Sequence, residues 1–250
     1  MTTRIFHFSD THFGVENGPA LEAVARAAAD ERPDAILCTG DLTQRATHRE
    51  FAQATQYLAR FDAPVIVCAG NHDMPYYNLW ERFTDPYRRF RKLAAAVGGT
   101  LESPDIVFVP FKTTVRAQPR FPWSDGIVMQ AALEQTVRHL EELAGDPRLK
   151  LVTCHHPLLG AADGVKNSTI GGDRAFAALA AAGADAVLSG HVHIPFDLVR
   201  SREGHSMRMI GTGTLSTRLR HGAPPCYHVL TIENGEIAVE RRDLPPLEDA

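Results

Sequence analysis

Short apolar runs alternate with helix-like patterns along much of this chain of 250 residues. The strand-like runs have the length and the apolar content of buried strands, and the helix-like segments repeat apolar side chains at helical spacing. The strand-like runs are residues 5–8, 35–38 and 64–68, and the helix-like segments are residues 19–31 and 47–60. Thr47 and Glu50 also form a capping box at the start of the second helix. Alternation of this kind predicts βαβ units around a largely parallel sheet, and therefore the α/β class.

The alternation continues beyond the third strand and then gives way to consecutive strands. Further helices are predicted at residues 86–97, 130–143 and 174–182, further strands at 105–111, 149–154 and 186–189, and a loop at 112–126. After His193, strands follow at residues 196–200, 206–211 and 227–233, and Asn234-Gly235 predicts a hairpin turn into residues 236–241. No segment has the composition of a linker or repeats at solenoid length. We therefore predict a single domain over residues 1–250 with two sheets, in which residues 196–241 form the C-terminal strands and hairpin.

Five short polar motifs, most of them directly after a strand-like run, contain candidate metal ligands. In chain order the motifs are DTH, GD, GNHD, HHP and GHVH, and the candidate ligands are Asp10, His12, Asp41, Asn71, His155, His191 and His193. Loops at the carboxyl ends of neighbouring parallel strands meet at one edge of a sheet, so we expect these side chains to converge. Asp10 and His12 are two residues apart and should point to the same side, where they can hold one ion. Gly40 and Gly70 should allow the backbone to turn sharply before the next ligand.

The chemical types of these side chains restrict the metals. Carboxylate and amide oxygens suit Mn²⁺ or Mg²⁺, and imidazole nitrogens suit Fe, Zn, Mn and Co. The set therefore predicts two divalent first-row metal ions, with Mn or Fe preferred and Zn or Co as alternatives. Nothing in the set favours calcium.

With all five motifs in this order, the sequence resembles the calcineurin-like metallophosphoesterase superfamily, and within it the bacterial cyclic-nucleotide phosphodiesterase-like branch. The resemblance covers about residues 4–213, which would be the catalytic core. It implies a four-layer α/β/β/α sandwich of two mixed sheets flanked by helices, with the metal site at one edge. It also implies that Asp10, His12 and His193 hold one metal, that Asn71, His155 and His191 hold the other, and that Asp41 bridges both. In the HHP motif the family uses the first histidine, so His155 is the expected ligand and His156 lies behind it.

The resemblance further implies a metal-dependent phosphoric ester hydrolase in which a metal-activated hydroxide attacks phosphorus. His72 would stabilise the transition state or protonate the leaving oxygen, and Asp73 would position His72 or cap a following helix. We expect a phosphodiesterase acting on a small diester, such as a cyclic nucleotide. A DNA-processing nuclease of the same superfamily is the alternative, because its opening motif, SDTH, is also the sequence of residues 9–12. A non-catalytic scaffold is a more remote alternative, because none of the ligands is missing.

Charge and hydropathy bear on partners and location. The chain has 26 Lys and Arg against 30 Asp and Glu, a net charge of −4, so it has no overall positive charge to bind a nucleic-acid backbone. Nucleic acid is therefore the less favoured partner. The N-terminus lacks the pattern of a signal peptide, and no apolar run approaches the roughly 20 residues that span a membrane. We expect a cytoplasmic protein without a membrane partner; its oligomeric state stays open.

Several basic side chains lie outside the five motifs. Arg45 follows Asp41 at the spacing of a phosphate-binding arginine in protein Ser/Thr phosphatases, although an ordinary surface arginine is the preferred interpretation. The loop 112–126 would either pack on the domain or form a lid over the substrate with Arg116, Arg120, Phe121 and Trp123. The basic run at residues 88–92 is interpreted as a solvated helix face. The four cysteines, Cys38, Cys68, Cys154 and Cys226, are expected to be buried free thiols.

Overall fold

The computed structural model describes residues 2–117, 124–162, 169–220 and 222–245. The helices are α1 (Gly18–Glu31), α2 (His48–Leu58), α3 (Leu79–Thr84), α4 (Arg88–Val97), α5 (Gln130–Glu142) and α6 (Gly172–Ala181). The strands are β1 (Thr2–Phe8), β2 (Ala35–Cys38), β3 (Val65–Val67), β4 (Ile106–Pro110), β5 (Gly126–Ile127), β6 (Leu149–Thr153), β7 (Thr169–Ile170), β8 (Ala186–Ser189), β9 (Phe196–Arg202), β10 (His205–Gly211), β11 (Cys226–Glu233) and β12 (Glu236–Asp243).

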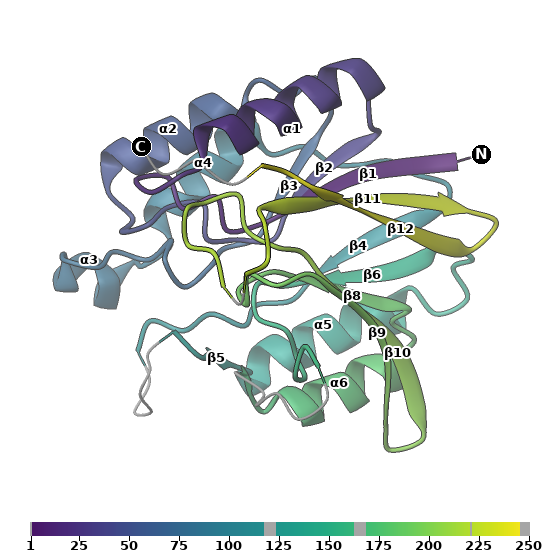
Figure 1. The fold of residues 1–250 in the computed structure, drawn as a ribbon. Coiled ribbons are helices and arrows are strands. Elements are labelled where there is room, and N and C mark those ends of the chain that lie inside the picture. The colour runs from purple at the N-terminus through teal and green to yellow at the C-terminus, as the bar shows by residue number, and fades with distance from the viewer. Residues whose placement is uncertain (1, 118–123, 163–168, 221, 246–250) are drawn as a thin grey trace.

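Two five-stranded mixed sheets lie face to face between two groups of helices (Figure 1). The first sheet has the order β12-β11-β1-β2-β3, with β1, β2 and β3 parallel and β11 antiparallel to β1. The second has the order β4-β6-β8-β10-β9, with only β9 antiparallel to its neighbour. Helices α1, α2 and α4 cover the first sheet, and α5 and α6 cover the second. The α/β class and the four-layer sandwich of two mixed sheets are confirmed.

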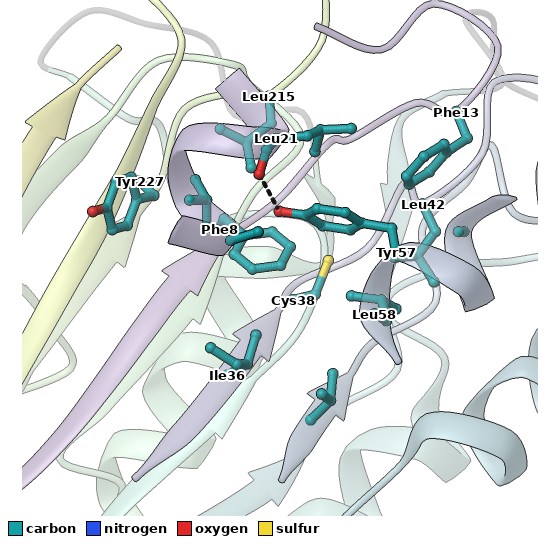
Figure 2. Close-up of a cluster of buried hydrophobic side chains, with 14 of the residues drawn as sticks. Phe8, Phe13, Leu21, Ile36, Cys38, Leu42, Tyr57, Leu58, Leu215 and Tyr227 are labelled. Carbon is teal, nitrogen blue, oxygen red and sulfur yellow. Dashed lines mark hydrogen bonds between the residues drawn. The ribbon is translucent and has the colours of Figure 1, made fainter. Parts of the chain in front are cut away.

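Three apolar layers hold the sandwich together. Figure 2 shows the layer between the first sheet and its helices, where Phe8 and Cys38 pack around Tyr57, whose hydroxyl donates to the Leu21 carbonyl at 3.0 Å. A second layer joins α5 and α6 to the second sheet, with Phe176 completely buried. The third lies between the sheets and includes Ile5 and Leu188. Alternating side chains of β1 therefore enter two different layers, as a strand with both faces covered requires.

Most predicted elements are present with shifts of one to three residues at their ends. The capping box is formed, since Thr47 Oγ1 accepts from the Glu50 amide at 3.2 Å and the Glu50 carboxylate accepts from the Thr47 amide at 3.0 Å. Asn234 and Gly235 both have positive φ and connect β11 to β12, as the hairpin prediction required.

Other details of the chain differ from the predictions. Helix α3 was not predicted, because six residues are too few to show a helical period. The loop 112–126 ends in the short strand β5, which pairs with β7.

All four cysteines are free thiols, three buried and Cys68 partly so, and burial raises the pKa of the Cys68 thiol to about 11. None of the described helices is both long and apolar enough to cross a membrane.

Candidate metal centre

The seven predicted ligands follow the carboxyl ends of five parallel strands and converge at one edge of the sandwich. Asp10 and His12 follow β1, Asp41 follows β2, Asn71 follows β3, His155 follows β6, and His191 and His193 follow β8. These strands belong to both sheets, so the site forms only where the two sheets face each other. Asp10 and His12 are completely buried, and Asp41 is 2% exposed.

One group of donor atoms surrounds the position next to Asp10. Asp10 Oδ1 lies 3.1 Å from His193 Nε2 and 3.6 Å from His12 Nε2, and the two imidazole nitrogens are 3.2 Å apart. Metal–ligand bonds of about 2.1 Å at tetrahedral or octahedral angles separate neighbouring donor atoms by about 3.0–3.4 Å. Two of the three distances lie in this range and the third is 0.2 Å longer, so the three side chains are close to the spacing of ligands to one ion.

A second group lies on the other side of Asp41. His155 Nε2 is 3.1 Å from Asn71 Oδ1 and 3.4 Å from Asp41 Oδ2, and the His191 ring lies 5.1 Å from the His155 ring between centroids. Asp41 Oδ2 is also 3.7 Å from His12 Nε2 of the first group. The Asp41 carboxylate thus lies between the two groups, at the place where a bridging ligand would be.

Left-handed backbone conformations are concentrated at these residues. Nine described non-glycine residues have positive φ, and five of them are predicted ligands: Asp10 (55°), His12 (42°), Asp41 (50°), His191 (70°) and His193 (59°). Each such conformation costs on the order of 1 kcal/mol and persists only where the surrounding structure enforces it. The local backbone is therefore shaped to aim these side chains inward, at a cost that the rest of the fold offsets.

Backbone carbonyl groups orient three histidine rings. The Nδ1 atoms of His155, His193 and His72 donate to the carbonyls of Thr39 (2.8 Å), Arg218 (2.6 Å) and Gln44 (2.7 Å). Since a carbonyl can only accept, the proton of each neutral ring is on Nδ1. In the neutral ring each Nε2 then carries the lone pair that can bind a metal or accept a proton.

Hydrogen bonding favours His155 over His156 as the metal ligand. His156 lies beside His191, with ring centroids 4.4 Å apart, but both of its nitrogens are already bonded. Nδ1 lies 2.9 Å from Thr113 Oγ1, and Nε2 donates to the Ser124 carbonyl at 3.0 Å. The geometry therefore supports His155 as the ligand and His156 as a support behind His191.

The surroundings of the two carboxylates, Asp10 and Asp41, keep both of them negatively charged. Burial disfavours both carboxylates, yet attraction to His193 and hydrogen bonds from the histidines hold the pKa of Asp10 well below its usual value, and His155 and His72 do the same for Asp41. In turn Asp41 outweighs burial and raises the pKa of His155 to about 9, whereas burial and His155 lower the pKa of His191 to about 3.

No lysine or arginine forms an ion pair with either carboxylate in the described part of the chain. Two buried carboxylates opposed only by histidines therefore make a site that needs positive charge, and the oxygen and nitrogen donors fit two divalent ions.

Asp73 and two glycines hold the ligand loops together. The Asp73 carboxylate accepts from the amides of Gly70 (2.9 Å), Leu42 (3.2 Å) and Thr43 (2.9 Å), so it joins the loops that carry Asn71 and Asp41. The predicted helix cap is wrong, since Asn78 caps α3. Asp73 contacts His72 only through the Thr43 hydroxyl, which lies 2.9 Å from Asp73 Oδ1 and 3.1 Å from the His72 carbonyl. Gly40 has the expected positive φ, whereas Gly70 is needed for space, because a Cβ there would lie 2.0 Å from Asp41 Oδ1.

The remaining basic side chains have diverse surroundings. The Arg45 guanidinium lies over the Tyr77 ring, 5.9 Å from its centroid. Arg88 and Arg91 have exposed side chains, 63% and 59%, as a solvated helix face requires. Arg89 differs from that prediction, since its side chain is 14% exposed and pairs with the buried Glu81. In the 112–126 loop, Arg116 donates to the Phe83 carbonyl at 2.6 Å; Arg120, Phe121 and Trp123 lie outside the described residues.

Arg218 was not among the predicted site residues. Its Nη1 atom lies 3.1 Å from His72 Nε2, 3.3 Å from His12 Nε2 and 3.3 Å from Gln44 Oε1. It belongs to the loop between β10 and β11, beyond the last metal motif, and no local spacing marks it. Only the position of that loop in the folded chain brings Arg218 to the site.

Solved structures show that the same fold occurs widely. A dimetal phosphatase from Danio rerio matches with a TM-score of 0.70 and 13% identity over 96% of each chain. Purple acid phosphatase PPD1 from yellow lupin matches with a TM-score of 0.67 and 12% identity over 97% of this chain and 52% of that one. GAP50, described as the anchor in the inner membrane complex of Plasmodium, matches with a TM-score of 0.61 and 14% identity over 97% of this chain and 84% of that one. At such identities the likeness shows the fold alone.

Comparison with curated proteins found no match. The model of the calcineurin-like phosphoesterase family matches residues 3–195, a region that contains every predicted ligand. This family uses a binuclear divalent metal centre, in agreement with the groups of Asp and His side chains described above. The chain belongs to the calcineurin-like phosphoesterase family.

Proposed function

We propose that the protein is a binuclear metal-dependent phosphodiesterase that hydrolyses a small diester, such as a cyclic nucleotide. The observation that carries the proposal is the convergence of seven oxygen and nitrogen donors into two groups that share Asp41. The preference for a diester rests on the resemblance of the motifs to the cyclic-nucleotide branch. Among the matched structures, GAP50 is described as an anchor, so the fold by itself does not establish catalysis.

The first role of the chain is to hold the ions and the substrate. Asp10, His12 and His193 would hold one ion, and Asn71, His155 and His191 the other, with Asp41 between them. When bound, the two ions supply Lewis-acid activation of water and of the phosphoryl oxygens.

The second role is proton transfer by His72. Its ring makes an edge contact with the His12 ring, with centroids 4.8 Å apart, and a nitrogen of His72 lies within 4.8 Å of donor atoms of His12 and Asp41. The Gln44 carbonyl accepts from Nδ1 in both the neutral and the charged ring, so a second proton must be carried on Nε2. His72 can therefore give that proton to the leaving oxygen without turning its ring.

The test is His72→Ala in protein reconstituted with two Mn²⁺ ions. We expect turnover of a cyclic-nucleotide or chromogenic diester to fall by about 10²-fold or more, because a general acid contributes roughly that factor. Metal content, measured by mass spectrometry, should stay at the wild-type level, since His72 is not in the predicted ligand set. His48→Ala, at an exposed histidine of α2, is the matched control and should keep full turnover.

A metal-loaded His72→Ala protein with near-normal diester turnover would refute the role of His72. The substrate class is tested separately with a panel of cyclic nucleotides, glycerophosphodiesters, phosphomonoesters and short DNA. Activity confined to DNA would replace the small-diester proposal by the nuclease alternative. Bound metal without activity on any ester would favour the scaffold alternative.

A further inference from the structure

Arg218 reaches the metal centre from a loop that has no part in the ligand motifs. Its side chain is partly buried, and Nη1 lies within 3.1–3.4 Å of nitrogens on both His72 and His12. The third neighbour of Nη1 is the Gln44 side-chain oxygen at 3.3 Å. The guanidinium thus lies between the proposed proton donor and one predicted ligand.

The charge of Arg218 is not matched by an acid. Arg89 and Arg208 are also partly buried and pair with Glu81 and Asp197. The buried Arg82 instead donates to the carbonyls of Arg116 and Pro75. Within residues 2–117, 124–162, 169–220 and 222–245, no carboxylate forms an ion pair with Arg218. A cation that faces imidazole nitrogens in a partly buried site gains most from an added anion.

The loop around Arg218 is attached to the metal centre by backbone and side-chain hydrogen bonds. Thr214 Oγ1 donates to the Asp10 carbonyl at 2.7 Å, and the Thr217 amide donates to the Val15 carbonyl at 3.0 Å. The Arg218 carbonyl itself accepts from His193 Nδ1. Because these bonds hold the backbone on both sides of the side chain, little ordering is needed when a ligand binds, which favours affinity.

We propose that Arg218 is the residue that binds the phosphoryl group of the substrate, by donating to its non-bridging oxygens beside His72. The proposal rests on the function proposed above. A guanidinium presents parallel N–H donors that match two oxygens of one phosphoryl group, which an ammonium cannot reproduce. Arg45, the arginine that sequence spacing suggested for this task, lies over Tyr77 instead.

The test measures binding of inorganic phosphate to metal-reconstituted protein by titration calorimetry. We expect Arg218→Gln to weaken phosphate binding by about 10- to 100-fold, the range for a lost hydrogen bond to a charged group. Metal content should be unchanged, because the bond to His193 comes from the Arg218 backbone. Arg218→Lys should recover only part of the affinity, since it restores the charge without the fork. Arg220→Gln, at an exposed arginine of the same loop, is the matched control and should bind phosphate as the wild type does.

Two outcomes would overturn the proposal. One is an Arg218→Gln protein with full metal content and unchanged phosphate affinity. The other is a loss of metal in Arg218→Gln, because the side chain would then support the site and not the ligand. If the wild type hydrolyses diesters while Arg218→Gln binds phosphate normally, this inference fails and the proposed function stands. If phosphate binding depends on Arg218 but no ester is hydrolysed, the proposed function fails and the inference stands.

Discussion

Two buried histidines should make folding stability sensitive to acid. His7 of β1 and His228 of β11 are register partners on the face between the sheets, with ring centroids 6.2 Å apart. His7 is completely buried and His228 is 2% exposed, and the Nδ1 atom of each has no hydrogen-bond partner among the described residues. Burial lowers the pKa of His228 to about 4, and burial with repulsion from His228 lowers the pKa of His7 well below its usual value.

The direction in which pH changes the stability follows from proton binding in the folded and unfolded states. In the unfolded chain His228 takes up a proton as the pH falls through about 6.5, whereas in the folded chain it stays neutral until about pH 4. The unfolded chain binds more protons between these values, so stability that is fully present above pH 6.5 is lost as the pH falls toward 4. With these two pKa values, His228 alone lowers the free energy of unfolding by about 2 kcal/mol between pH 8 and pH 5.

The assay is urea denaturation at pH 8 and pH 5, with a chelator present so that pH-dependent metal binding does not contribute. His228→Gln removes the titration and keeps a polar side chain. Its own effect on packing is present at both pH values and cancels in the difference. We expect the variant to lose about 2 kcal/mol less than the wild type between the two pH values. His205→Gln, at an exposed histidine, should lose as much as the wild type. Equal losses in wild type and His228→Gln would refute the reasoning, because His228 would then not be neutral in the folded chain.

Gly70→Ala should lower metal content below the wild-type value, because the added Cβ would lie 2.0 Å from Asp41 Oδ1 and displace the carboxylate that is proposed to bridge the two ions. Gly18→Ala adds a Cβ with nothing within 4 Å, so it should keep full metal content, and equal content in both variants would contradict the prediction. Thr47→Ala removes the hydroxyl that accepts from the Glu50 amide and should lower the free energy of unfolding by about 1 kcal/mol. Unchanged chemical denaturation would show that the capping box does not stabilise α2.

The elements that sequence analysis predicted correctly are those encoded by nearby residues. A capping box at Thr47 and a hairpin at Asn234-Gly235 involve side chains only a few positions apart, and both form as expected. The helix α3 and the paired strands β5 and β7 escaped prediction because they are too short to show a period. The bonds of Asp73 to Leu42 and Thr43 were not predicted, since they join loops that lie about 30 positions apart.

The sequence by itself determined the chemistry available to this protein: oxygen and imidazole donors in short motifs, placed where parallel strands end. Which donors meet was decided by the tertiary structure, because the site forms between two sheets whose strands come from distant parts of the chain. The same stacking enforces left-handed backbone at five predicted ligands and bonds both nitrogens of His156 elsewhere. It also brings Arg218, 146 positions from His72, to within 3.1 Å of that ring. Local spacing cannot predict such a meeting, because the physical cause is the packing of whole sheets.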